Sequence, residues 1–133
     1  MIDKENEIFN RLSAKLKLKY PKLSITSEYT ATPPSFPHVC IEQVDSKHSK
    51  GLQTTNKQAE YIDFTIEVNA YSNKRVGKKS ECKGIISVID DEMFLMNMTR
   101  VALIPVPNLE DTRIYRLTGL YKGQADENNF YRS

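Results

Sequence analysis

The stretch from Gln58 to Ser72, QAEYIDFTIEVNAYS, decides the fold because apolar and polar residues alternate along it. The side chains expected on one face are all apolar: Ile62, Phe64, Ile66, Val68 and Ala70. Such alternation is typical of a strand with one buried face. The stretch also exceeds the usual length of about five or six residues, so we predict a wide sheet or a strand that projects past its own subunit.

Two amphipathic helices flank this strand in the sequence. Apolar residues recur at helical spacing from Asp3 to Lys19, and Pro21 predicts the end of that helix because its ring disfavours helical geometry at the preceding residue. The same spacing returns from Ser80 to Leu95. Asn97 follows at the position where a left-handed residue ends many helices.

Four more strands complete the predicted order α-β-β-β-α-β-β. They are expected at Leu23–Tyr29, Val39–Val44, Thr99–Val106 and Thr112–Gln124. This order predicts an α+β fold in which two helices pack on one face of an antiparallel sheet. We expect a single domain over residues 1–133, with a flexible loop at 45–57 and a frayed tail at 125–133.

Composition narrows the classes of protein that the chain can be. Its 133 residues suit one domain, and 39% hydrophobic with 27% charged residues is a globular composition. The apolar runs are too short to cross a bilayer, and the opening MIDKENEIF predicts no targeting segment. A near balance of 19 basic and 17 acidic residues argues against nucleic-acid binding driven by bulk charge. Cys40 and Cys82 are expected to remain thiols, with Cys82 buried.

One strand pattern raises the question of a metal site. His38, Cys40 and Glu42 alternate, so all three would project from one face, and His and Cys are good zinc ligands. A fourth ligand is missing, because the only other His and Cys are His48 and Cys82. We therefore interpret the trio as ordinary strand residues and expect no metal.

The acidic run Asp90, Asp91 and Glu92 raises the question of acid–base catalysis. Neighbours on a helix point about 100° apart, so these carboxylates would not converge on one substrate atom. Solvated helix surface is the preferred interpretation. The sequence also lacks a recognisable nucleophile motif and a glycine-rich phosphate loop. We therefore predict neither catalytic residues nor a cofactor.

A group of cations lies around the start of the second helix: Lys74, Arg75, Lys78, Lys79 and Lys83. Such a group could hold phosphates. The segment GKKSECKGIIS after three strands is loosely similar to the lysine-bearing second helix of a double-stranded RNA-binding domain. Two further strands follow and Glu81 interrupts the cations, so a solvated basic face is preferred. RNA binding stays open as the alternative function from a different class.

Several fragments, in this order and spacing, resemble one family. They are YPKLSITSEY (Tyr20–Tyr29), FPHVCIEQVD (Phe36–Asp45), the strand ending in EVNAYS, KKSECKGIISVIDDEM (Lys78–Met93) and VPNLEDTRIYRLTGLYKGQAD (Val106–Asp126). Together they are similar to the tail terminator (tail completion) proteins of long-tailed bacteriophages and prophages. The resemblance covers most of the chain.

This resemblance implies a structural virion protein without enzymatic activity. Its implied partners are copies of itself in a hexameric ring, the major tail tube protein and the head–tail connector protein. The ring would end tube polymerisation and form the surface that joins tail to head, with genomic DNA passing through without sequence-specific binding and with no membrane partner. It would be assembled in the bacterial host cytoplasm and reside in the tail or neck of the virion. A stopper or adaptor protein of the same neck is the nearest alternative.

A closed ring needs heterologous contacts between identical subunits, and interfaces favour aromatic residues and Arg. The long strand, the proline-rich segment TATPPSFP and the loop at 45–57 are suitable parts. We expect the subunit or tail-tube interface to include Phe36, Pro37, Tyr61, Glu67, Tyr71, Arg113, Tyr115 and Tyr121. The other interpretation is that these tyrosines simply cover the sheet.

Overall fold

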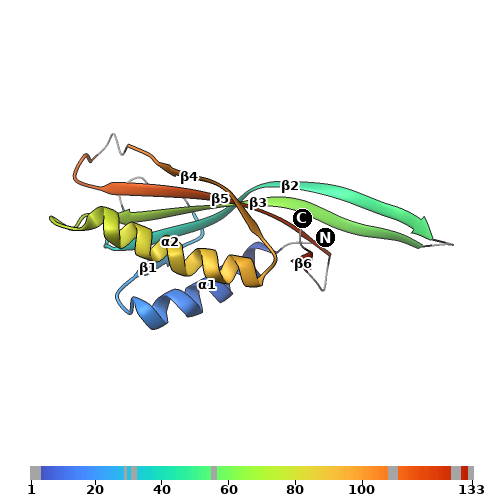
Figure 1. Cartoon of the computed structure of the whole chain (residues 1–133), viewed down its shortest axis with the longest axis horizontal. Coiled ribbons are helices and arrows are strands. Elements are labelled where there is room, and N and C mark those ends of the chain that lie inside the picture. The colour runs from blue at the N-terminus through green and yellow to red at the C-terminus, as the bar shows by residue number, and fades with distance from the viewer. Residues whose placement is uncertain are drawn as a thin grey trace.

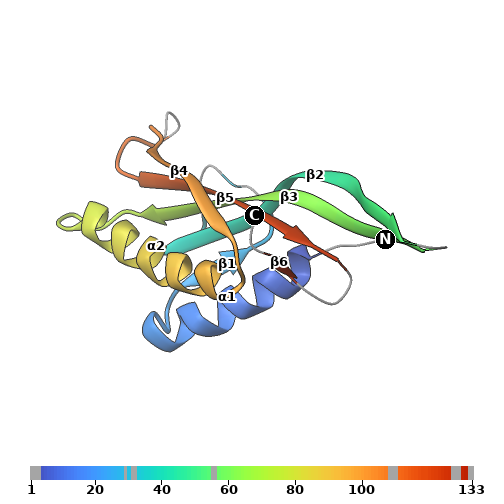
Figure 2. The same ribbon diagram turned by 45° about the vertical axis from the view of Figure 1, so that its right-hand side comes forward.

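The computed structural model describes residues 4–28, 30, 33–54, 57–107, 111–126 and 130–131, with the backbone alone for 48–54, 57–61 and 131. Its elements are α1 (Glu5–Lys19), β1 (Ser24–Thr26), β2 (His38–Thr54), β3 (Lys57–Ser72), α2 (Lys78–Leu95), β4 (Thr99–Pro105), β5 (Tyr115–Ala125) and β6 (Phe130–Tyr131). The strand order is β1-β2-β3-β5-β4, and β6 pairs with β5. Both helices lie on one side of this sheet (Figures 1 and 2).

The predicted class and element order are confirmed, and the sheet is mostly antiparallel. One pair differs, because β1 runs parallel to β2. Parallel neighbours need a connection that returns the chain to the same end of the sheet, and the segment between Thr26 and His38 is long enough to do so. Among the described helices, none is long and apolar enough to cross a membrane.

The alternation in β3 buries the apolar face of the strand, as predicted. Its apolar residues from Ile62 to Ala70 are buried in the main core against both helices. α1 contributes Ile8, Leu12 and Leu16 to this core, and α2 contributes Cys82, Ile85, Ile86, Ile89 and Met93. β5 presents Gly123 to the same side, where an added Cβ would lie 2.9 Å from Phe64 Cζ. The glycine therefore leaves room for an aromatic ring in the core.

The end of α2 is fixed by a Schellman motif. Asn97 has a left-handed backbone with φ 63°, as its position predicted. The Met98 amide donates to the Met93 carbonyl at 2.9 Å, and the Asn97 amide donates to the Phe94 carbonyl at 3.0 Å. Met93 and Met98 are both buried, which supplies the apolar contact that accompanies such a motif. The chain can then turn directly into β4.

The predicted loop at 45–57 is wrong, because β2 continues to Thr54 and β3 begins at Lys57. A bulge at Val44 shifts the register, and pairing then resumes from Asp45 with Thr65. Main-chain pairing with β3 holds this polar segment as a strand, although its composition is typical of a loop. Residues 55 and 56 lie outside the described chain.

The two long strands form a ribbon that leaves the body of the sheet. β5 ends where Ala125 pairs with Ile62, and the strand residues beyond that point are 49–54 of β2 and 57–61 of β3. We call these residues the arm, and Figure 1 shows it at the right of the molecule. The length of β3 predicted a wide sheet or projection past its own subunit, and the structure shows that it extends past the end of β5.

The prediction of a frayed tail at residues 125–133 is wrong for its described strand residues. Ala125 is buried in β5, and Phe130 and Tyr131 form β6 against Gln124 and Ala125. The Phe130 ring lies 6.4 Å from the Phe64 ring, between centroids. β6 thus occupies the edge of β5 that β4 leaves free. Residues 127–129, 132 and 133 lie outside the described chain.

Candidate functional site: the open face of the sheet

The helices cover one face of the sheet, and we call the other the open face. It consists of alternate residues from Asp63 to Tyr71 on β3 and from Arg116 to Gln124 on β5, with the paired positions of β2 and β4. Its centre carries polar side chains with defined partners. The open face is where a molecule of this shape can make contacts beyond its own core.

A hydrogen-bond network joins β3 to β5 on this face. Asn69 Oδ1 accepts from Arg116 Nε at 2.8 Å and from Thr118 Oγ1 at 2.6 Å. The Arg116 guanidinium also lies 5.9 Å from the centroid of the Tyr71 ring. These contacts fix Arg116 above the sheet, so its charge has a defined position on the open face.

One end of the open face is closed by a small second core. Cys40 and Tyr71 are fully buried there, and Phe36 and Ile114 from the flanking loops pack against them. Burial raises the pKa of the Cys40 thiol to about 11. The thiol therefore stays protonated and is not accessible as a nucleophile.

Two acidic residues meet at the middle of the open face. Glu42 of β2 lies directly opposite Glu67 of β3. Like charges in this cross-strand position repel each other. Within the described part of the chain, Glu67 has one ion-pairing cation, Arg116 at 3.9 Å, and Glu42 has none. The pair is therefore a place where a cation from outside would be favoured.

The same row of the sheet continues with apolar residues toward β4. Leu120 lies opposite Glu67, and Ala102 of β4 lies opposite Leu120. Ile104, two residues further along β4, is 50% exposed, and Val101 at the β4 bulge is 51% exposed. An edge strand with exposed apolar side chains is a common site of association.

The predicted interface residues lie in different parts of the molecule, and only some of them are on the open face. Glu67 and Tyr71 lie on the open face, and Phe36 with half-buried Pro37 lies at its closed end. Tyr61 is in β3 at the base of the arm, but its side chain lies outside the described part.

Tyr115 and Tyr121, which were expected at the interface, lie on the helix side of the sheet. Tyr121 is 1% exposed in the helix-side core, and Tyr115 packs against that core. Alternate residues of β5 between them, Arg116, Thr118 and Leu120, lie on the open face, so the tyrosines point to the helices. Burial raises the pKa of the Tyr121 hydroxyl, and its hydrogen bond to the Asp90 carboxylate adds to this. Tyr121 therefore offers almost no surface for contact with another subunit in this fold.

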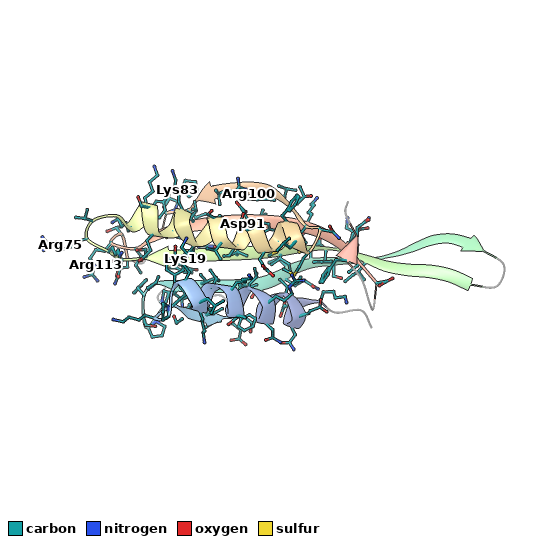
Figure 3. The ribbon with its side chains drawn as sticks, turned by 60° about the horizontal axis from the view of Figure 1, so that its bottom comes forward. Lys19, Arg75, Lys83, Asp91, Arg100 and Arg113 are labelled. Carbon is teal, nitrogen blue, oxygen red and sulfur yellow. The ribbon has the colours of Figure 1, made fainter. Side chains whose placement is uncertain are left out.

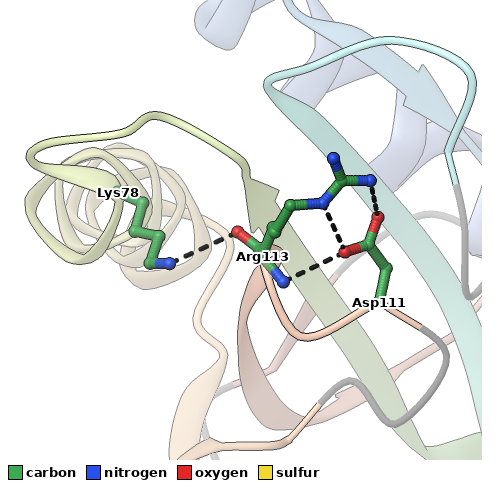
Figure 4. Close-up of polar contacts among 3 residues, drawn as sticks. All are labelled: Lys78, Asp111 and Arg113. Carbon is green, nitrogen blue, oxygen red and sulfur yellow. Dashed lines mark hydrogen bonds and ion pairs between the residues drawn. The ribbon is translucent and has the colours of Figure 1, made fainter.

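Arg113 is at the end of the molecule opposite the arm. Its Nε and Nη2 donate to the Asp111 carboxylate at 3.0 and 2.9 Å, and its carbonyl accepts from Lys78 Nζ at 3.3 Å (Figure 4). The hydrogen bonds between Arg113 and Asp111 lower the pKa of the Asp111 carboxyl and raise the pKa of the Arg113 guanidinium. The Arg113 side chain is highly exposed, so it remains a candidate for an interface.

The predicted cation group gathers at this same end. Arg75 lies in the turn before α2, near Arg113, while Lys83 is further along the helix (Figure 3). Lys74 is paired with Glu81 at 3.1 Å. Arg75, Lys79 and Lys83 are exposed. The arrangement agrees with a solvated basic end in which Lys74 is already ion-paired within the chain.

His38 of the possible zinc trio has other partners. Both ring nitrogens of buried His38 are hydrogen bonded, Nδ1 to Ser24 Oγ and Nε2 to Thr26 Oγ1 at 3.1 Å. Burial lowers the pKa of His38. Over the described residues, no group of three metal-ligating side chains comes together.

The acidic run on α2 diverges, as predicted, but only Asp91 is plain helix surface. Asp90 accepts from the Tyr121 hydroxyl and from Arg100, each at 2.7 Å. Glu92 is buried and accepts from Arg11 Nη2 of α1 at 2.8 Å. Two of the three carboxylates therefore connect elements within the fold, which the sequence interpretation missed.

Sequence reasoning placed Asn69 on the polar face of its strand but missed Arg116 and Leu120 as open-face residues. The signal was present in the alternation of β5, where Arg116, Thr118, Lys122 and Gln124 share one face. Gly119 and Gly123 weaken the apolar pattern of the opposite face. Comparison with protein-family models and with curated protein sequences gave no match.

Proposed function

We propose that this protein is a structural, non-catalytic subunit that assembles with copies of itself into a closed ring on the end of a phage tail tube. In this function the ring stops tube polymerisation and presents the surface that joins the tail to the head connector. The proposal starts from the resemblance of the ordered fragments to tail terminator proteins. Two surfaces of the molecule support the proposal because they are suited to association: the arm and the open face.

The observation that carries the proposal is the arm. A two-stranded ribbon without a third strand or a helix against it is marginal by itself in water. Residues 49–54 and 57–61 extend past the end of β5, so within the described chain the ribbon has no third strand. Its polar main-chain edges are suited to pairing with a neighbour, as exposed strand edges are in general.

The open face supplies a second surface for association. It combines a positioned Arg116, the Glu42–Glu67 pair and an apolar row that includes Leu120. Arg and apolar side chains surrounded by polar ones are typical of subunit interfaces. Because the arm and the open face are different surfaces, they favour heterologous contacts, which close into rings.

The test is polymerisation of the matching tail tube protein in the presence of this chain. We expect capped tubes of limited length with a ring at one end by negative-stain electron microscopy, and a stable complex with short tube oligomers by mass measurement in solution. Unlimited tubes, together with a chain that stays monomeric beside tube protein, would contradict the proposal.

A matched variant shortens the arm without changing the body of the sheet. Residues 50–60 are replaced by Asn-Gly, because Ser49 pairs with Tyr61 and Asn-Gly forms a two-residue hairpin turn. We expect the variant to fold but to lose ring formation or tube capping. Connector protein is tested in parallel, because a stopper of the same neck would bind it and leave tube length unchanged.

A further inference from the structure

The turn before α2 has the opposite chemistry to the middle of the open face. This turn, residues 73–77, carries exposed Arg75 and the apolar Val76, which is 88% exposed. It lies at the end of the molecule opposite the arm (Figure 3). Gly77, with φ 87°, ends the turn in a left-handed conformation. The turn therefore presents a cation and an apolar side chain next to each other.

On the open face, the complementary groups are also adjacent. Glu67 lies between Glu42 on β2 and Leu120 on β5 in one row of the sheet. Opposite residues on neighbouring strands are about 5 Å apart at Cβ. Two consecutive residues of an inserted turn can therefore reach an acid and an apolar side chain of this row at once.

We propose that the turn of one copy docks on the open face of the next copy, with Arg75 at the Glu42–Glu67 pair and Val76 against Leu120. The inference deepens the proposed function, because it rests on self-association and names the surfaces that meet. Arg75 supplies a cation to Glu42, which has none within the described chain, beside Arg116, which already pairs with Glu67, and Val76 removes apolar surface from water. Because the two surfaces differ, repetition of this contact is heterologous and closes into a ring or continues as a filament.

Disulfide trapping tests the contact directly. A full-length Val76→Cys variant is mixed with a Leu120→Cys variant under mild oxidation, and the dimer is followed on non-reducing gels. The native thiols do not interfere because Cys40 and Cys82 are buried. The matched control pairs Val76→Cys with Leu18→Cys, since Leu18 is 81% exposed on α1. Ala102→Cys, which lies opposite Leu120 on β4, serves as a second open-face site if Leu120→Cys lowers stability.

We expect the open-face pairs to form dimers about ten times faster than the control pair, the ratio that one favourable ion pair can supply. A variant with both Val76→Cys and Leu120→Cys should give a ladder of multimers. Equal rates for open-face and control pairs would overturn the inference.

Charge reversal gives a second readout. Arg75→Glu in the Val76→Cys partner should slow trapping, and Glu42→Lys in the Leu120→Cys partner should restore it. Lys83→Glu is the matched control, because Lys83 is also exposed but lies along α2. Slowing by Lys83→Glu as large as that by Arg75→Glu would also overturn the inference. None of these assays contains tube protein, so failure of tube capping and failure of this contact remain distinguishable.

Discussion

The Tyr121 hydroxyl donates a 2.7 Å hydrogen bond to the Asp90 carboxylate and joins β5 to α2 through the core. Asp90 also pairs with Arg100 of β4 at 2.7 Å, so one carboxylate connects three elements. This relationship places a tyrosine expected at an interface inside the fold. In the same orientation of β5, the polar side chains of that strand lie on the open face.

Tyr121→Phe should therefore destabilise the fold. The change removes the hydroxyl but keeps the ring, and loss of a hydrogen bond to a charged acceptor costs about 1.5–3 kcal/mol. Urea unfolding measures the difference. Tyr115→Phe is the control, because within the described chain the Tyr115 hydroxyl has no hydrogen-bond partner. Equal losses for both variants would show that the Asp90 contact contributes nothing.

Gly123→Ala should destabilise the core by overpacking. The added Cβ would lie 2.9 Å from Phe64 Cζ and 3.0 Å from Met98 Cγ, so both side chains must shift. Such insertions cost about 1–3 kcal/mol. Lys122→Ala, at the neighbouring exposed position, is the control and should stay within about 0.5 kcal/mol in the same unfolding assay. A neutral Gly123→Ala would mean that the Phe64 ring can move without cost.

Asn97→Ala should cost about 1–2 kcal/mol, because Asn tolerates a left-handed backbone at φ 63° through its polar side chain whereas Ala does not, and the side-chain bond to the Phe130 carbonyl is lost. Asn97→Gly should be the milder change, since glycine adopts this backbone freely but also lacks the bond. Thermal unfolding compares the two variants. If Gly proves as costly as Ala, the bond to Phe130 rather than the backbone conformation decides the position.

The buried thiols predict a loss of stability at high pH. Burial raises the pKa of Cys40 to about 11 and that of Cys82 to about 12, from the ordinary thiol value of 9.0. A raised folded-state pKa gives stability that is fully present below the unfolded value and is lost as pH rises through the folded value. The free energy of unfolding should thus fall from about pH 9 upward through pH 11.

Urea titrations at several pH values check this dependence. A Cys40→Ala and Cys82→Ala double variant is the control and should show a flatter profile over the same range. Thiol labelling of the native protein at pH 8 should be slow and should follow global unfolding. Rapid labelling of Cys40 in the folded protein would contradict its burial at the closed end of the open face.

Part of the candidate site could be read from the sequence because the signal is local. The alternation of β3 put Glu67 and Tyr71 on the face away from the core, and the structure places them there. Tyr121 was wrongly expected at the interface because interfaces favour aromatic residues. The alternating polar residues of β5 already contained the correct answer, but glycines on the opposite face obscured it.

The local pattern by itself determined the two helices, the long central strand and the predominantly antiparallel two-layer fold, since helical and strand periods depend on neighbouring residues only. Only the tertiary structure decided that β1 runs parallel to β2, that polar residues 45–54 belong to a strand and that Glu42 faces Glu67. Each of these depends on which distant segment lies alongside. That choice follows from main-chain pairing and core packing across the whole chain, and no short window of sequence contains both partners.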